Sequence, residues 1–414
     1  MIAGTRVATR QNMAVIKALT FVMFMMFAMT TDSVGIIIPQ IITTFHLSLT
    51  AAGSFQYATM GGIALAGFLL GHLADRLGRK RTIIVGLTLF ATASFLFVTG
   101  NSFWYFCALM AVSGAAIGIF KTAALALIGD IVTSTKEHTS TMNTVEGFFG
   151  VGSILGPAIL ARLLSRGLGW QWLYVLAGAI CVLLIVTAAA VRYPAAGSAK
   201  TDIRHKANAM AVIGNRYLLG FSCGAFLYVA VESAVYVWMP TLIAGYRGSA
   251  AWLGVYSISI FFLLRAAGRF LGAWMLNRLP WTGVLALSSA LILACFAASA
   301  VAGVSWAIFL LPLSGLFMSV IYPTINSRGI SCLARSEHGA GAGVLLFFTC
   351  LSAVLAPLAM GAVSDAMGGP QYGFVLATGF AALLFAGLLL NWMFNPTIRV
   401  FERLDETEYN KMDA

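Results

Sequence analysis

Long apolar stretches recur along the whole chain, each long enough to cross a lipid bilayer. A membrane-spanning α-helix needs about 20 mostly apolar residues, because the hydrocarbon core of a bilayer is about 30 Å thick. Twelve stretches meet this requirement, with approximate limits 16–42, 51–73, 82–100, 103–128, 142–165, 170–191, 216–244, 250–276, 281–302, 304–327, 338–365 and 372–395. The sequence therefore predicts an all-α membrane protein with twelve transmembrane helices.

Composition supports the same class. Of 414 residues, 60% are hydrophobic and 9% are charged, whereas charged residues make up about a quarter of an ordinary soluble domain. The net charge of +11 comes from basic residues scattered between the apolar stretches, so it indicates membrane topology and not nucleic-acid binding. The six cysteines have no metal-ligand or paired spacing, and no catalytic triad or nucleotide loop is recognisable. We expect no metal, no cofactor and no enzymatic activity.

The distribution of basic residues predicts the orientation in the membrane. If the N-terminus is cytoplasmic, most of the 25 Lys and Arg fall in cytoplasmic segments or at cytoplasmic helix ends. We therefore expect both termini inside, in a multi-pass plasma membrane protein of the bacterial inner-membrane type. The first apolar run is too long for the core of a signal peptide, so it should remain as a membrane anchor.

The two halves of the sequence resemble one another at an offset of about 200 residues. The matching pairs are Asp32 and Glu232, Pro39 and Pro240, Gly53 and Gly254, Gly114 and Gly315, and Pro157 and Pro357. Such parallel repeats are related by a pseudo-two-fold axis along the membrane normal. We expect a six-helix bundle over 1–191, a cytoplasmic linker over 192–215, a second six-helix bundle over 216–395 and a cytoplasmic tail over 396–414.

The segment between the second and third apolar stretches concentrates charge in a short turn, GHLADRLGRKR at 71–81. Its pattern Gly-x-x-x-Asp-Arg-x-Gly-Arg-Lys resembles the loop between the second and third helices of the major facilitator superfamily, a family of solute transporters. The resemblance implies an electrostatic latch of Asp75, Arg76 and Arg79, with Asp130 at the end of the fourth helix. The alternatives are that the basic residues only set topology and that Asp130 is a solvated helix-end charge.

Five ionisable side chains fall inside apolar stretches, where a charge is costly unless it faces a cavity or a partner. They are Asp32, Lys121, Glu146, Glu232 and Arg265. A carboxyl in low dielectric favours its neutral form and can take up and release a proton, so Asp32 is the first candidate for proton coupling and Glu146 the second. The alternatives are an ion pair of Lys121 with Glu146, and neutralisation of Glu232 by Arg265.

Two further arginines lie toward the inner end of the eighth stretch. Arg269 and Arg278 follow Arg265 there, close to the predicted membrane boundary. Long basic side chains near helix ends commonly reach the polar interface. We interpret both as interfacial anchors.

Several segments together resemble the proton symporters of fucose, galactose and glucose within that superfamily. They are GIIIPQ at 35–40, FKTAA at 120–124, NTVEGFFG at 143–150, FLYV at 226–229, WMP at 238–240, GRF at 268–270 and IYPT at 321–324. Two departures matter. Lys121 stands where that branch often has an acid or amide, and the acid of its first helix is replaced by Gly35, one turn after Asp32. A cation in the cavity favours an anionic ligand.

These observations lead to one main hypothesis and one alternative. The main hypothesis is a proton-coupled importer, a monomer in the lipid bilayer, that moves a sugar, sugar acid or other organic anion by alternating access. The expected substrate-binding side chains are those of Lys121, Asn143, Tyr228, Glu232, Tyr236, Arg265, Tyr322 and Asn326. The alternative is a proton-driven antiporter that exports drugs or metabolites, suggested by the partial motif Gly152-Ser-Ile-Leu-Gly156-Pro157 in the fifth stretch.

Overall fold

Every regular element of the described chain is a helix. The computed structural model describes residues 2–70, 73–131, 135–193, 212–333, 338–398 and 400. Ten of the described helices are long and apolar enough to cross a membrane. Of the other two predicted spans, α4 (Ser54–Leu70) has 17 residues and α6 (Arg79–Leu96) begins with three consecutive cations. The protein is thus an all-α membrane protein, as the apolar stretches predict.

Contacts divide the chain into two compact units. Unit 1 comprises Met1–Leu47 and Ala52–Ser198, and unit 2 comprises Ser48–Ala51 and Ala199–Ala414. The helices of unit 1 are α1 (Ile2–Thr31), α2 (Val34–Phe45), α4, α5 (Leu73–Arg76), α6, α7 (Phe103–Ile131), α8 (Thr135–Ser165) and α9 (Gln171–Ala190). Those of unit 2 are α11 (Arg216–Ser233), a π-helical turn over Ala234–Trp238, α12 (Met239–Ile243), α13 (Ala251–Val255), α14 (Ser257–Leu276), α15 (Trp281–Ala302), α16 (Val304–Met318), α17 (Ile321–Ser331), α18 (His338–Met367) and α19 (Pro370–Phe394). The short helix α3 (Leu49–Ala52) lies where the chain passes between the units.

Several predicted spans are interrupted, the eighth among them at Tyr256, between α13 and α14. The first is continuous in the sequence prediction, but α1 ends at Thr31 and α2 begins at Val34. The seventh contains the π-helical turn, and the tenth divides into α16 and α17. Hydropathy averaged over a whole span does not reveal these breaks, because a few polar residues such as Thr31, Asp32 and Ser33 lie within long apolar runs.

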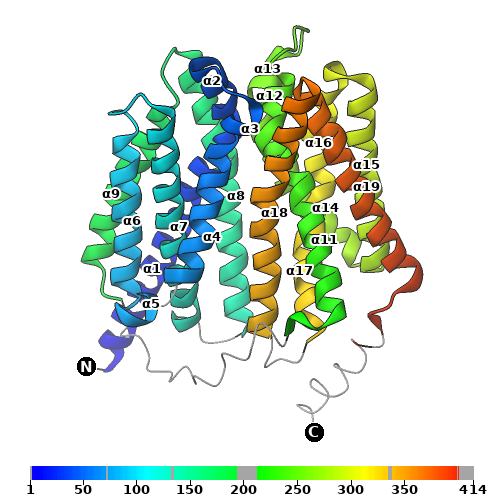
Figure 1. Ribbon diagram of the computed structural model, residues 1–414. Coiled ribbons are helices and arrows are strands. Elements are labelled where there is room, and N and C mark those ends of the chain that lie inside the picture. Colours follow the sequence, from blue (N-terminus) through cyan, green and yellow to red (C-terminus); the bar gives the residue numbers. More distant parts are fainter. Residues whose placement is uncertain are drawn as a thin grey trace. The chain divides into compact units, whose positions relative to one another are not determined.

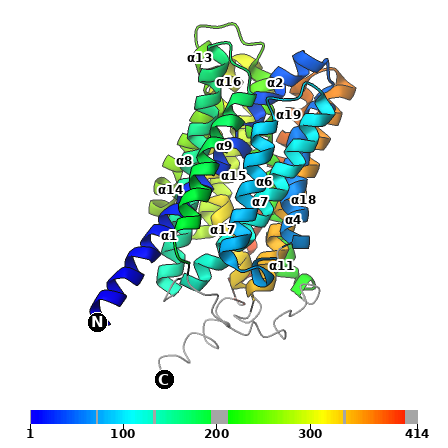
Figure 2. The same cartoon turned by 90° about the vertical axis from the view of Figure 1, so that its left-hand side faces the viewer.

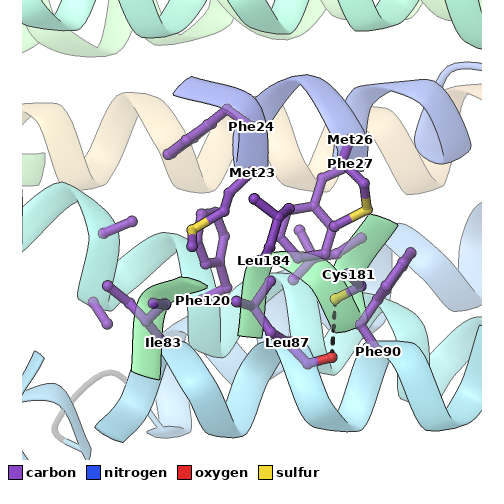
Figure 3. Close-up of a cluster of buried hydrophobic side chains, with 14 of the residues drawn as sticks. Met23, Phe24, Met26, Phe27, Ile83, Leu87, Phe90, Phe120, Cys181 and Leu184 are labelled. Atoms are coloured by element: carbon purple, nitrogen blue, oxygen red, sulfur yellow. Dashed lines mark hydrogen bonds between the residues drawn. The ribbon is translucent and has the colours of Figure 1, made fainter. Parts of the chain in front are cut away.

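Unit 1 is built around three close helix pairings. Helix α7 packs between α4 and α6, and α1 packs along α8 (Figures 1 and 2). Figure 3 shows the buried side chains that fill the space among α1, α6, α7 and α9. There the ring of Phe27 lies 4.9 Å from that of Phe90 and 4.7 Å from that of Phe120. In a bilayer, such van der Waals packing and not water exclusion holds the helices together.

Glycines permit the close pairings, and they do so at matching places in the two units. A Cβ on Gly114 of α7 would overlap the carbonyl of Thr59 in α4, and a Cβ on Gly315 of α16 would lie 2.5 Å from the carbonyl of Phe261 in α14. The two helix contacts therefore recur at the same offset as the sequence repeat. In both helix pairs, α4–α7 and α14–α16, a small residue at the interface lets the two backbones approach closely.

The pairing of α1 with α8 generates a first prediction. A Cβ on Gly156 would overlap backbone atoms of Met29, whereas a Cβ on Gly147 of the same helix would meet no atom within 4 Å. We expect Gly156→Ala to lower the free energy of unfolding by about 1–3 kcal/mol through overpacking. Gly147→Ala is the matched control, and it should leave the free energy of unfolding unchanged or raise it slightly. Melting curves in detergent measure the difference; equal melting temperatures for the two variants would contradict the packing account.

Candidate functional site

The two acids matched by the repeat both lie where a helix is interrupted. Asp32 occupies the turn between α1 and α2. Glu232 is the penultimate residue of α11, directly before the π-helical turn over Ala234–Trp238. Interruptions of this kind occur frequently at functional sites, because they expose backbone groups and redirect side chains. Each unit therefore presents one acid at a break in its first long helix.

Asp32 is buried and receives hydrogen bonds from hydroxyl groups. The hydroxyl of Ser153 on α8 donates to Oδ2 of Asp32, and that of Thr31 makes a longer contact of 3.4 Å to Oδ1. Gly152, the neighbour of Ser153, allows the approach, since a Cβ there would overlap the Met25 carbonyl of α1. The close packing of α8 on α1 thus delivers the hydroxyl to the carboxyl. The sequence prediction did not identify Ser153 as a partner of Asp32.

Lys121 is half-buried beside the same face of α8. Its ammonium lies 5.2 Å from the ring centroid of Phe149, a cation–π contact. The carbonyl of Phe149 also accepts a hydrogen bond of 3.0 Å from Ser153. Glu146 is exposed, and the ion pairs among the described side chains do not include one between Lys121 and Glu146. Asp32 and Lys121 are therefore linked through Ser153 and Phe149, and Glu146 stands apart.

Glu232 forms an ion pair with Arg265 in unit 2. Oε1 of Glu232 lies 2.5 Å from a guanidinium nitrogen of Arg265, and both side chains are mostly buried, with 10% and 21% of their surfaces exposed. The interpretation that Arg265 neutralises Glu232 is confirmed. Glu232 thus has a cationic partner, in contrast to Asp32, which receives hydroxyl donors.

Tyrosines surround this ion pair. Tyr228, one turn before Glu232 on α11, is 1% exposed, and its ring stacks on Tyr322 of α17 with centroids 5.9 Å apart. The Tyr228 hydroxyl lies beside Glu232, but the geometry falls short of a well-formed hydrogen bond. Tyr236 of the π-helical turn and Asn326 of α17 are half-buried. The structure thus brings together Tyr228, Glu232, Arg265 and Tyr322 from three helices of unit 2, α11, α14 and α17.

Arg269 and Arg278, both interpreted as interfacial anchors, differ in exposure. Arg269 follows Arg265 by one turn of α14 and is half-buried, with an Nε that is inaccessible to solvent. Arg278 is exposed, and its guanidinium lies 4.7 Å from the ring centroid of Trp274, as an anchor should be. The i, i+4 spacing places Arg269 on the helix face of Arg265. Its role as an anchor stays a prediction.

The predicted latch is only partly within the described side chains. The side chains of Asp75, Asp130 and Asn143 lie outside them, while Arg76 is exposed and Arg79 is half-buried. Gly78 has φ +85°, which is favourable for glycine and explains that residue in the motif.

Lys80, next in the motif, has a structural role. It donates hydrogen bonds of 2.7 and 2.8 Å to the carbonyls of Ala189 and Val191, at the end of α9. A cation is stabilising at a helix C-terminus, where carbonyls lack intrahelical partners. Lys80 therefore ties α6 to α9 within unit 1.

Two cavities lie within single units, away from the acids. One of about 470 Å³ in unit 1 is lined by residues such as Gln40, Asn101 and Trp170. The other, of about 320 Å³ in unit 2, is a mostly apolar groove between α11 and α19. Neither is lined by a predicted substrate-binding residue. The described side chains also contain no group of three or more His, Cys, Asp or Glu that could hold a metal ion.

Comparison with known proteins gives consistent results over nearly the whole chain. A sequence model of the Major Facilitator Superfamily matches residues 20–357. The glucose/galactose transporter of Brucella abortus biovar 1 (strain 9-941) is 24% identical over 405 residues, covering 93% of this chain and 96% of that protein. The crystal structure of the nucleoside transporter NupG has a TM-score of 0.74 at 14% identity, covering 92% of this chain and 98% of that one. The crystal structure of FucP in the outward conformation has a TM-score of 0.63 at 22% identity, covering 92% and 99%.

The Glu232–Arg265 ion pair generates a second prediction. Removing one partner of a buried pair leaves an uncompensated charge, so Arg265→Gln should lower the free energy of unfolding by roughly 3 kcal/mol. The double variant Glu232→Gln/Arg265→Gln removes both charges and should recover part of that loss. Thermal melting of the purified protein at neutral pH provides the measurement. A double variant less stable than Arg265→Gln alone would contradict the pairing as the source of the effect.

Proposed function

The chain belongs to the major facilitator superfamily, and we propose that it is a proton-coupled importer of a small hydrophilic solute. It is a multi-pass membrane transporter and not an enzyme. The solute crosses by alternating access between the two halves, and the protein acts as a monomer in a bacterial inner membrane with both termini in the cytoplasm. The positions of the basic residues support this orientation.

The environment of Asp32 is the observation that carries the coupling proposal. A buried carboxyl at a helix break can exchange a proton if its neighbours tolerate both protonation states. The hydroxyl of Ser153 does so, because it can donate to the anionic carboxylate or accept from the neutral acid. Glu232 has a different kind of partner, because it forms an ion pair with Arg265, whose guanidinium offers donors only. Asp32 therefore takes the proton, and Glu146 is the second candidate.

The solute class follows from the polar groups near the acids and from the relatives. In unit 1, Lys121 offers a cation beside an aromatic ring, and in unit 2 the stacked rings of Tyr228 and Tyr322 flank the ion pair. Aromatic faces with hydroxyl groups suit polyhydroxylated ligands. The relative from Brucella abortus is named as a glucose/galactose transporter. We therefore assign a sugar, a sugar acid or another organic anion as the cargo, with Tyr236, Asn326 and Asn143 as further binding residues.

The latch remains part of the proposal. Asp75, Arg76, Arg79 and Asp130 would hold one conformation closed by charge pairing, as the family motif implies. The structure supports only its framework: Gly78 shapes the turn and Lys80 fixes it to α9.

Import is favoured over export by the packing of α8. The glycines that suggested an exporter, Gly152 and Gly156, are accounted for by the close approach of α8 to Met25 and Met29 of α1. They therefore need no further role in export. Transport in right-side-out and inverted vesicles would establish the direction.

A third prediction tests the role of Asp32. In proteoliposomes with an imposed pH gradient, the wild type should accumulate radiolabelled solute above equilibrium. Asp32→Asn should only equilibrate it, because the amide cannot take up a proton, while solute-for-solute exchange persists. Glu146→Gln is the matched control and should accumulate solute normally.

The outcomes distinguish the two acids. Unchanged accumulation by Asp32→Asn would remove Asp32 from the coupling role. Loss of accumulation by Glu146→Gln alone, with exchange retained, would assign the proton to Glu146. A screen with glucose, galactose, glucuronate and gluconate supplies the solute for these assays.

A further inference from the structure

The groove between α11 and α19 in unit 2 is apolar along its length and polar at one end. Its volume is about 320 Å³, and the two helices that form its sides pack against each other. The apolar lining includes Phe221, Leu227, Ile325, Leu383, Leu384 and Leu388. The polar lining residues Arg216, Asn391 and Thr397 lie at the start of α11 and at the end of α19. Polar and apolar groups are thus separated along the groove.

Glycines on both walls keep the groove open. A Cβ on Gly220 of α11 or on Gly387 of α19 would meet no atom within 4 Å, and both residues are exposed. They therefore differ from Gly114 and Gly156, whose missing Cβ lets two backbones approach closely. Glycine in a helix interior is destabilising relative to alanine, so close helix packing does not account for these two glycines. Their small size instead leaves space beside the helices.

A buried hydroxyl at the polar end of the groove lacks a partner. Thr397 is 3% exposed, and its hydroxyl forms no hydrogen bond with the residues that the structure describes. A hydroxyl removed from water without a compensating hydrogen bond costs free energy. Because Thr397 lines the groove, an occupant with an acceptor oxygen would satisfy this hydroxyl.

The same end of the groove carries a positive charge. The guanidinium of Arg216 donates a hydrogen bond of 2.9 Å to the hydroxyl of Tyr217, and it lies 4.9 Å from the centroid of that ring. Within the described ranges, no carboxylate forms an ion pair with Arg216. Arg216 is exposed, so its charge is held in place by Tyr217 and remains accessible to an anion.

The surroundings of the groove are those of a lipid-facing surface. Its walls belong to the membrane spans Arg216–Ile243 and Pro370–Phe394. On α19, Leu383, Leu390 and Met393 are each more than half exposed, as expected for side chains that contact acyl chains. The polar end coincides with the ends of both spans, where lipid head groups lie. A phospholipid has the matching distribution of chemistry, with an apolar chain attached to an anionic phosphate.

We propose that the groove between α11 and α19 binds an anionic phospholipid, with an acyl chain between the helices and the phosphate at Arg216. The Thr397 hydroxyl donates to a phosphate or ester oxygen of the same lipid. Basic pockets between transmembrane helices on the cytoplasmic side commonly hold anionic head groups, and the proposed orientation places this end of the groove there. The lipid site is separate from the acids and does not depend on the identity of the solute.

Native mass spectrometry of the purified protein tests the site. Dioleoyl phosphatidylglycerol and dioleoyl phosphatidylcholine share their acyl chains and differ in net charge, so they are titrated in parallel. The wild type should retain one phosphatidylglycerol at concentrations where phosphatidylcholine is lost. Arg216→Gln should weaken phosphatidylglycerol binding roughly five- to tenfold, the effect expected for one cation near a head group. Arg278→Gln removes an exposed arginine outside the groove and should bind like the wild type.

A matched pair of glycine variants tests the place of the acyl chain. Gly387→Leu fills the groove and should weaken phosphatidylglycerol binding at least tenfold. Gly379→Leu is the control, because Gly379 lies on the same helix, is exposed and has equal space for a Cβ, but does not line the groove. Melting of each variant without lipid reports any loss of folding, and Arg216→Gln, which alters an exposed side chain, provides the test if Gly387→Leu does not fold.

Three results would overturn the assignment. They are equal binding of the two lipids by the wild type, wild-type phosphatidylglycerol affinity in Arg216→Gln, and an equal loss of binding in Gly379→Leu and Gly387→Leu. Glycerol 3-phosphate supplies the phosphate without acyl chains and should not raise the melting temperature of the wild type. If it stabilises the protein as much as phosphatidylglycerol does, the site binds a soluble anion and the lipid assignment is wrong.

Discussion

A charged side chain inside an apolar helical bundle must be neutralised, hydrogen-bonded or reached by water, and the functional features of this protein follow from that constraint. Most of its 414 residues are apolar, so their side chains need no polar partner in the hydrocarbon core. Three charged side chains are held in specific surroundings: Asp32 by hydroxyl donors, Glu232 by Arg265, and Lys121 by the face of Phe149. These surroundings determine what each group can do. Hydroxyl neighbours can serve either protonation state of a carboxyl, whereas a guanidinium offers hydrogen-bond donors only.

The two halves of the repeat have the same backbone arrangement but surround their acids with different chemical groups. Asp32 and Glu232 occupy matching positions at interrupted helices, and the glycine contacts of α4 with α7 recur between α14 and α16. The two units therefore share the arrangement of the backbone, but the groups that contact their acids differ. Unit 1 presents a hydroxyl from α8 to its acid, and unit 2 presents a guanidinium from α14. This divergence is the basis for proposing Asp32, in unit 1, as the acid that carries the proton.

The sequence predicts the class of fold well because hydropathy responds directly to the bilayer. It also predicts the pairing of Glu232 with Arg265, since opposite charges on successive apolar helices have few other partners. It does not predict the break at Asp32, because the few polar residues there, such as Thr31 and Ser33, lie within a long run whose average hydropathy is that of one continuous span. Nor does it identify Ser153, one of many small polar residues, whose importance depends on how closely Gly152 lets α8 approach α1.

Proton movement itself is the most direct test of the central claim that Asp32 couples solute entry to a proton. With a pH-sensitive dye in weakly buffered medium, addition of a transported solute to wild-type proteoliposomes, without any imposed gradient, should make the external medium alkaline as protons enter with it. Asp32→Asn vesicles that exchange the solute should produce no such signal. Solute entry without any pH change in the wild type, or an equal pH change in Asp32→Asn, would contradict the account.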